Sequence, residues 1–298
     1  VLTSTGTING VTATIEAFIT RPQFKSEYAI LSAGPVKIAG NSTTIAGSNG
    51  AIHTNGDFTQ SGTGTIEQGV TASGDCNESN CSAAGGVAEE FVPVIEPSDY
   101  EQYADYIFNS DGTIDQNVSG TITTGVEGNA IFSQFSHNAN GWSVGNSSVV
   151  GTSIPNQAIL YFKDDFKATS VGDSTTPWEV TLIVEKSIAW TGNAYITNWQ
   201  DPDLTQDLQN LFLIAGNDIK MSSMQQDTRG LIACKDQASL SGGANLEGYL
   251  ISNNLTTDDN TVNGTETDGS GGLTLTYNGD LLAPVLSNKV TVLSWQKT

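Results

Sequence analysis

The sequence predicts a mainly β fold of stacked, β-solenoid-like rungs, with an N-terminal hairpin and one or two short helices. Two observations carry this prediction. Only 14% of the 298 residues are charged, while Gly, Ser, Thr and Asn are abundant, which is typical of short strands joined by many turns. A strand-corner-strand pattern also recurs along the chain. A β-sandwich with similar turns is the alternative.

The chain opens with a predicted hairpin. Residues 2–8 and 11–19 flank Asn9-Gly10, the pair preferred in a tight type I′ turn. Alternate residues of the second strand share one apolar face: Val11, Ala13, Ile15, Ala17 and Ile19. We therefore separate an N-terminal hairpin segment, residues 1–27, from a solenoid-like domain, residues 28–298, that carries an irregular insertion at about 90–165.

The recurring unit begins at Leu31, Ile183 and Ile214, and a fourth copy, from Ile232, fits with one extra residue. Each copy has a strand, a small or polar corner, a short alternating strand and a turn that is usually Gly. Such a unit cannot bury its apolar positions alone, but stacked units can. We therefore expect residues 28–70 and 180–255 to form one β core. Its buried positions would include Val36, Ile38, Ile188, Ile219 and Met221.

Two segments are predicted to be helical. After an extended, Pro-marked connection at 92–97, residues 98–101 read as a capping box, and Tyr100, Tyr103, Ala104 and Ile107 fall on one helical face, so we expect a helix over 99–108. A second short helix is expected after Asp201-Pro202. Its buried face would consist of Leu204, Leu208 and Leu211.

The formal charge of −21 excludes two classes of partner. A field of this sign repels the phosphates of nucleic acids and anionic lipid surfaces. It suits solubility alone or the binding of divalent cations. No stretch of the sequence has the length and apolar character of a membrane span.

The three cysteines favour an oxidising compartment. Cys76 and Cys81 bracket four residues of a Gly/Ser/Asn-rich loop, a spacing that can close a small disulfide ring. A zinc site is the alternative, but it would need two further ligands in a chain whose histidines are His53 and His137. A disulfide here implies export. Cys234 lies in an apolar run and is interpreted as a buried small hydrophobe.

Calcium is the cofactor that the acidic loops predict. Carboxylate and carbonyl oxygens at short spacing are the ligands that Ca²⁺ prefers. The first candidate loop contains Asp258, Asp259, Glu266 and Asp268, and the second contains Asp201 and Asp203. Plain solvated acids are the competing interpretation.

No catalytic motif points to an enzyme. The nucleophile elbow, the zinc-protease motif, the phosphate-binding loop and the dinucleotide fingerprint do not occur in the sequence. The alternative function is a carbohydrate-active enzyme or carbohydrate-binding module on a β-solenoid. That function needs acids and aromatics in one groove, and the candidate residues are Trp190, Tyr195 and Trp199 near Asp201.

The order of elements resembles the exported domains of PilX-like, type IV pilus-associated proteins, the minor-pilin-like and pilus-assembly families of bacteria. The resemblance lies in segments 6–16, 28–34, 52–57, 97–106, 178–183, 211–216 and 292–295. It covers most of the chain and implies an extracellular or envelope-associated protein without enzymatic activity.

Together these observations predict an exported surface protein, structural or adhesive, that acts by assembly or binding as a pilus-associated or filament-forming subunit. The expected partners are further copies of the chain, other envelope or pilus proteins, or glycans. A terminal hairpin presents unpaired backbone groups at its edge, so residues 1–19 are the expected contact. The alternative is that the hairpin packs on its own solenoid, as terminal strands often do.

Overall fold

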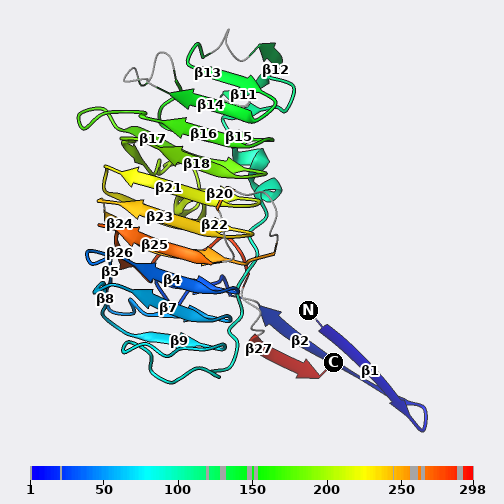
Figure 1. Cartoon of the computed structure of the whole chain (residues 1–298). Helices are drawn as coiled ribbons and strands as arrows, with labels where there is room; N and C mark the ends of the chain where they lie inside the picture. The colour runs from blue at the N-terminus through cyan, green and yellow to red at the C-terminus, as the bar shows by residue number, and fades with distance from the viewer. Residues whose placement is uncertain are drawn as a thin grey trace.

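The computed structural model describes residues 2–20, 22–118, 121–127, 132–145, 150, 154–243, 245–255, 261–262, 266–286 and 291–297. The fold is mainly β, as the sequence predicts. Most strands form an elongated stack, which we call the body, and three strands form an arm that projects from its side (Figure 1).

The body contains two long sheets. A 15-stranded sheet runs through β12 (Thr121–Glu127), β11 (Thr113–Val118), β10 (Tyr106–Phe108), β15 (Ala158–Phe162), β17 (Trp178–Val184), β20 (Leu211–Ala215), β22 (Thr228–Cys234) and β24 (Asn245–Ser252). Two series of strands continue from β24. The first is β26 (Thr274–Tyr277), β5 (Thr44–Ala46) and β8 (Thr65–Ile66), and the second is β3 (Ile30–Ser32), β6 (Ile52–Thr54) and β9 (Val70–Ala72). In addition, β19 (Ile196–Thr197) pairs with β17.

The second sheet has nine strands. Its order is β13 (Phe135–Asn138), β14 (Gly141–Gly145), β16 (Phe166–Thr169), β18 (Ile188–Thr191), β21 (Ile219–Met224), β23 (Ala238–Gly242), β25 (Thr267–Gly271), β4 (Val36–Ala39) and β7 (Phe58–Ser61). Successive coils of the chain pair in parallel. Ile188, for example, lies opposite Ile219, which lies opposite Ala238. From β15 to β23 each coil contributes one strand to each sheet, whereas in the coils from β3 to β8 each contributes two strands to the first sheet and one to the second.

The apolar core fills the space between the two sheets, because inward side chains of one coil stack on those of the next. At the end near β10 the core is aromatic. The Phe162 ring stacks on Phe108 and on Phe166, with 4.2 Å between ring centroids in both pairs. The predicted buried residues are confirmed: Val36, Ile38, Ile188, Ile219 and Met221 are all at most 2% exposed.

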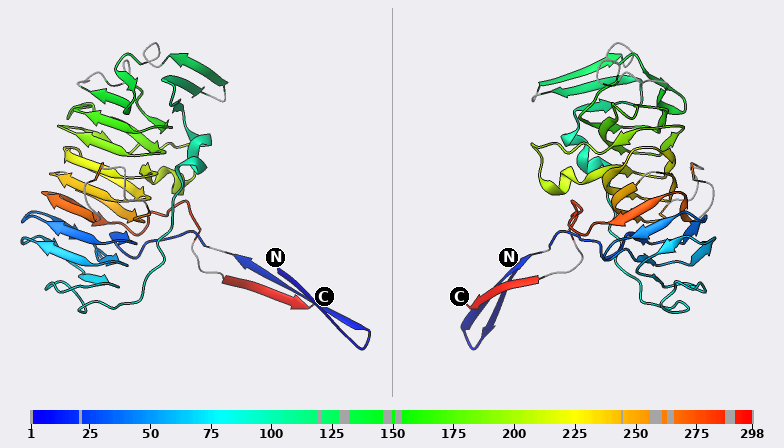
Figure 2. Two further views of the ribbon diagram at one scale, coloured as in Figure 1. Left: turned by 45° about the vertical axis from the view of Figure 1, so that its right-hand side comes forward. Right: turned by 90° about the vertical axis from the view of Figure 1, so that its left-hand side faces the viewer.

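The coils do not stack in sequence order. The chain first builds the lower coils, β3 to β9. It then runs along the side of the stack as an extended strap, residues 88–96, and continues through residues 97–105 to β10 near the opposite end (Figures 1 and 2). From there it descends until β24 meets β3, with Leu250 opposite Ile30, and β25 meets β4, with Thr267 opposite Val36. Residues 28–70 and 180–255 therefore form one continuous core, as predicted.

The arm is a three-stranded antiparallel sheet. It contains β1 (Leu2–Ile8), β2 (Val11–Thr20) and β27 (Thr291–Lys297), with β2 in the middle. Asn9 and Gly10 both have positive φ, 49° and 77°, which confirms the tight turn predicted at this pair. The sequence-based boundary placed everything from residue 28 onward in one unit, whereas β27 belongs with the hairpin. The two chain ends therefore lie together on the arm (Figure 1).

The helix predicted over 99–108 is present only in part, as a shorter 3-10 helix, η1 (Pro97–Tyr103). After Ala104 the chain extends into β10, where Tyr106 pairs with Leu160 of β15. The capping box does not form, since no side-chain bond caps the N-terminus of η1. Pairing with the sheet outweighs the helical periodicity because β10 extends the parallel ladder of the body.

The second predicted helix is present but shorter and later. Only α2 (Gln206–Gln209) is helical, and Thr205 rather than Asp201 precedes it. Leu204 and Leu208 are partly buried against the core, as expected of its inner face, whereas Leu211 already begins β20 and is fully buried.

The disulfide closes one end of the stack. Cys76 and Cys81 are bonded to each other, with 5.9 Å between their Cα atoms. Cys76 forms a bridge beside Phe58, and Cys81 forms one beside Val70, so the loop adds a last partial coil below β7 and β9. The loop that the disulfide closes thereby covers apolar residues that would otherwise be exposed at the end of the stack. With the two thiols joined, the zinc alternative is excluded.

Reduction of this bond is expected to lower the free energy of unfolding by about 2 kcal/mol, because the unfolded chain regains the freedom of a short loop. Alkylation followed by intact-mass measurement tests the pairing. Cys234 is free but buried, so the native, unreduced protein should take up no label and the unfolded, unreduced protein one. Three labels on unfolded, unreduced protein would contradict the pairing.

Candidate interaction surface

The arm has one apolar face that the body leaves uncovered. Directly opposed residues of neighbouring strands share a face, so the register places Ile8 beside Val11, and Ile19 beside Val292. The large apolar side chains on this face are strongly exposed. They are Leu2 at 60%, Ile8 at 76%, Val11 at 68%, Ile15 at 46% and Val292 at 58%.

The opposite face of the arm is lined by hydroxyl groups towards its tip, and by Glu16 and the 40% exposed Phe18 nearer the body. Thr5 and Thr14 are 3.1 Å apart between their Oγ1 atoms, and Thr7 and Thr12 are 2.9 Å apart. These pairs link β1 to β2 without burying charge. These cross-strand hydrogen bonds add to the stability of the hairpin, which has no core of its own.

The arm also has open strand edges. Within the described residues, β1 and β27 each pair only with β2, and β27 covers β2 only from Ile15 to Thr20. Towards the tip, residues 11–14 of β2 therefore have a strand partner on one side alone. Such edges can accept a further strand from another chain.

The acidic charge of the molecule lies outside the arm. Residues 22–285 carry −23 of a chain whose total is −21, whereas the three strands of the arm contain one acid, Glu16, and one base, Lys297. The arm is therefore the part of the molecule that a second, acidic copy repels least.

The predicted calcium ligands are only partly described. Asp258 and Asp259 lie outside the described residues. Glu266 lies 3.7 Å from Lys37, and burial, opposed by a hydrogen bond from Ser239 and by Lys37, raises the pKa of Asp268. Asp201 accepts the backbone N–H of Asp203 at 2.9 Å in the turn before α2. Asp203 itself is exposed.

No three His, Cys, Asp or Glu side chains converge as a metal site in the part of the chain that the structure describes. Calcium at the two acidic loops therefore stays a prediction. A chelator that lowers the melting temperature would support it.

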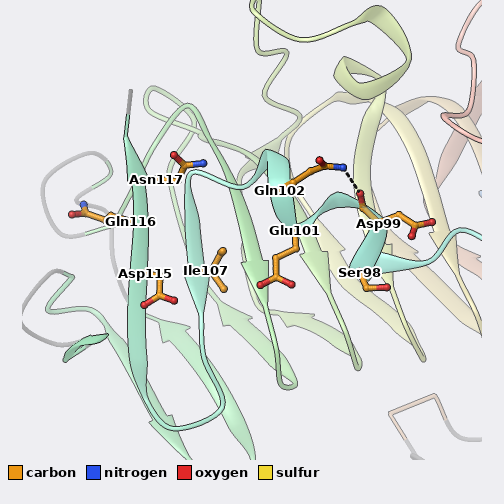
Figure 3. A pocket seen from close by; sticks show the side chains of 8 residues that line it. All are labelled: Ser98, Asp99, Glu101, Gln102, Ile107, Asp115, Gln116 and Asn117. Carbon is orange, nitrogen blue, oxygen red and sulfur yellow. Dashed lines mark hydrogen bonds between the residues drawn. The ribbon is translucent and has the colours of Figure 1, made fainter. Parts of the chain in front are cut away.

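A pocket of about 650 Å³ lies between η1 and the strands β10 and β11 (Figure 3). Its described lining is polar and acidic: Ser98, Asp99, Glu101, Gln102, Ile107, Asp115, Gln116 and Asn117. Two of its carboxylates already have structural partners. Glu101 pairs with Lys163 at 2.9 Å, and Asp115 accepts the backbone N–H of Gly125 at 2.7 Å. Both are thus used in holding the end of the stack together.

Three further residues bear on carbohydrate binding or catalysis. The aromatic groove expected for a carbohydrate-active protein is not formed as predicted, because Trp190 is fully buried between the sheets. His53 is also buried and bonds Thr71 and Asn55, as a structural histidine does. Burial, followed by the charges of Asp218 and Asp236, raises the pKa of the Cys234 thiol, which disfavours the reactive thiolate.

The strand β27 and the aromatic groups at the root of the arm were missed at the sequence level. Phe24 and Phe91 meet edge to face, with 6.1 Å between ring centroids, although 67 positions separate them. Neither belongs to the repeat, and no local pattern joins them. For β27 the only signal is the short alternation of apolar and polar residues around Val292.

No family model matches the chain, and no curated protein matches it. Among solved structures, the chain is similar to the competence-associated pilin ComZ from Thermus thermophilus, with a TM-score of 0.39 and 12% sequence identity. The match covers 99% of this chain and 80% of that one. A likeness of this degree supports no conclusion about function. Within the described residues, no helix has both the length and the hydropathy to cross a membrane.

Proposed function

We propose that this chain is an exported surface subunit, pilus-associated or filament-forming, that acts by assembly through its arm. The observation that carries the proposal is the arm's uncovered apolar face. Five large apolar side chains there are between 46% and 76% exposed, on a sheet that projects from the body (Figure 2). An exposed apolar face of this kind marks an interaction site more often than a solvated surface.

The setting of the arm supports the same function. The body is a stiff stack whose coils are tied by parallel ladders along its length. The arm carries both chain ends (Figure 1) and open strand edges. A body held together by continuous sheets, with an apolar arm projecting from it, suits an assembling subunit. Few additional residues have to become ordered when such an arm binds.

The disulfide supports export. Cys76 and Cys81 join in an exposed end loop, and such bonds persist in oxidising compartments and are rare in the cytosol. The body charge of −23 suits a subunit that must remain soluble until a specific contact forms.

The test compares two variants of the full chain that add the same charge to opposite faces of β2. Val11→Glu with Ile15→Glu places two carboxylates on the apolar face, and Thr12→Glu with Thr14→Glu places two on the hydroxyl face. We expect the wild-type chain to self-associate in light scattering over a range of concentrations. The first variant should weaken this association about tenfold or more, while the second changes it little.

Two outcomes would contradict the proposal. A wild-type chain that stays monomeric at all concentrations and binds no envelope protein would remove assembly as its function. Equal loss in both variants would show that the apolar face is not the contact. Circular dichroism and thermal melting check that both variants keep the folded body.

A further inference from the structure

A second pocket lies where the arm joins the body, and we call it the root pocket. Its volume of about 420 Å³ falls within the range of small-molecule binding sites. One wall comes from residues 22–31, which follow β2, and the other comes from residues 89–91 of the strap. The two walls are distant in sequence and meet only in the folded chain.

Both walls of the root pocket are held by backbone hydrogen bonds. The N–H of Phe24 donates to the carbonyl of Val285 at 2.8 Å. On the strap, Asn55 accepts the N–H of Glu90 at 2.9 Å and donates to its carbonyl at 3.0 Å. The pocket is therefore preformed, so binding a ligand does not carry the cost of ordering its walls.

One part of the root pocket is an aromatic surface. Phe91 is 37% exposed and packs edge to face on the buried Phe24. Tyr28 also lines the pocket, and its ring packs on that of the buried His53, with 5.2 Å between the centroids. The face of an aromatic ring carries partial negative charge, and the C–H groups of a ligand ring pack favourably on it.

The acidic groups of the root pocket are available to a ligand. In the part of the chain that the structure describes, the exposed carboxylates of Glu27, Glu89 and Glu90 have neither a hydrogen-bond partner nor an ion-pair partner. Burial, then the charges of Glu90 and Glu27, raises the pKa of Tyr28, as expected where these carboxylates converge on its hydroxyl group. In the pocket between η1 and β10, by contrast, two carboxylates are used in holding the stack together.

Lys25 lines the root pocket and also an adjoining pocket of about 340 Å³. Its side chain is 53% exposed, and its ion pair with Asp280 is long, at 3.8 Å, so its ammonium group can still donate to a ligand. The adjoining pocket is rich in hydroxyl, amide and carboxylate groups, from Ser48, Asn49, Glu247, Thr276, Asn278 and Asp280. The two pockets together form an elongated site that offers both donors and acceptors.

We propose that the root pocket binds a neutral oligosaccharide, with one sugar ring stacked on Phe91 and its hydroxyl groups bonded to the free carboxylates. A sugar ring has an apolar C–H face and a rim of hydroxyl groups that both donate and accept, which matches this lining. An anionic sugar would be repelled, because residues 22–285 carry −23. A compact cation would have no acceptor for Lys25. The site is separate from the apolar face of the arm, so the inference goes beyond the proposed function and does not depend on it.

An NMR titration of the full chain tests the inference. The probes are the mono- and trisaccharides of glucose, galactose, mannose and N-acetylglucosamine. We expect at least one trisaccharide to bind, about tenfold more tightly than its monosaccharide, because only the longer ligand reaches the adjoining pocket. The affinity should not change as salt is raised, since the ligand carries no charge.

Two variants locate the site and identify the ligand class. Phe91→Ala should weaken trisaccharide binding about tenfold or more, because it removes the stacking surface. Val94→Ala is its matched control, since Val94 lies on the same strap, is 38% exposed and lies outside the pocket lining. Glu89→Gln with Glu90→Gln keeps an oxygen acceptor at both positions and should weaken binding less than about threefold. Circular dichroism and thermal melting check that each variant is folded.

Three outcomes would overturn the inference. Wild type could bind none of the saccharides, or Phe91→Ala could bind them as wild type does. In the third, choline binds in place of the saccharides, and the double Gln variant loses it, so that the pocket is a cation site. The arm variant, Val11→Glu with Ile15→Glu, should bind the trisaccharide like wild type, so failure of assembly and failure of saccharide binding are observed separately.

Discussion

Replacement of Ile219 by Asp is expected to lower the free energy of unfolding by about 4–5 kcal/mol, because it buries an unpaired carboxyl group in an apolar stack. Ile219 is fully buried and lies between Ile188 and Ala238 in the parallel ladder of the second sheet. The coils above and below leave the carboxylate no route to solvent. Chemical denaturation followed by circular dichroism measures the loss.

Ile219→Val is the matched control. It removes one methylene from the same position, keeps a β-branched side chain and should cost about 0.5–1.5 kcal/mol. If the Asp variant were as stable as the Val variant, the side chain at 219 would have access to water and the stacked core would be wrong. A clear difference between the two variants in the free energy of unfolding would show that water is excluded from position 219.

The repeat allowed much of this core to be predicted. The copies that begin at Ile183 and Ile214 pair in register in the structure, with Ile183 opposite Ile214 and Ile188 opposite Ile219. Inward β-branched residues at fixed spacing gave a signal strong enough to align the coils. Burial of these positions follows from stacking alone.

The fourth copy was aligned one residue out at its start. The sequence alignment placed Ile232 with Ile214, whereas the structure places Ile232 with Leu213 and Ala233 with Ile214. The register shifts at Leu211/Leu213. Ala233 and Ala238 are both buried, but alanine is too common elsewhere to be read as a core residue from sequence.

The order in which the coils stack in space could not be predicted from the sequence. Leu250 stacks on Ile30 and Thr267 on Val36, although more than 200 residues separate each pair. Inward residues of different coils are nearly interchangeable in size and polarity, so no local pattern says which coils are neighbours. The same holds for the helix predicted at 99–108, where the partner strand β15, distant in sequence, decides the structure of Tyr106 to Phe108.

The candidate site was predicted in part. Asn9-Gly10 and the alternation after it identified the hairpin, and the hairpin is the exposed arm. The exposure of its apolar face depends on which surfaces the rest of the chain covers. This can be seen only in the folded structure. The pocket lined by residues 22–31 and 89–91 joins two segments more than 50 residues apart, and neither has a motif of its own.

The corner glycine Gly216 should tolerate no side chain. A Cβ there would lie 1.9 Å from the carbonyl oxygen of Glu185 in the preceding coil. The residue cannot retreat, because its N–H donates to Val184 at 2.9 Å and Ala215 is paired with the same Val184. Gly216→Ala must therefore push two coils apart, and we expect a loss of about 3 kcal/mol in the free energy of unfolding.

Gly243→Ala is the control for this glycine. A Cβ at position 243 would meet nothing within 4 Å, so the substitution removes only the freedom of the unfolded chain and should change stability by about 0.5 kcal/mol or less. Thermal and chemical denaturation of the two variants side by side measures the difference. Equal stability would mean that the coils at Glu185 and Gly216 stand further apart than the parallel ladder requires, since close stacking at the corner alone separates the two positions.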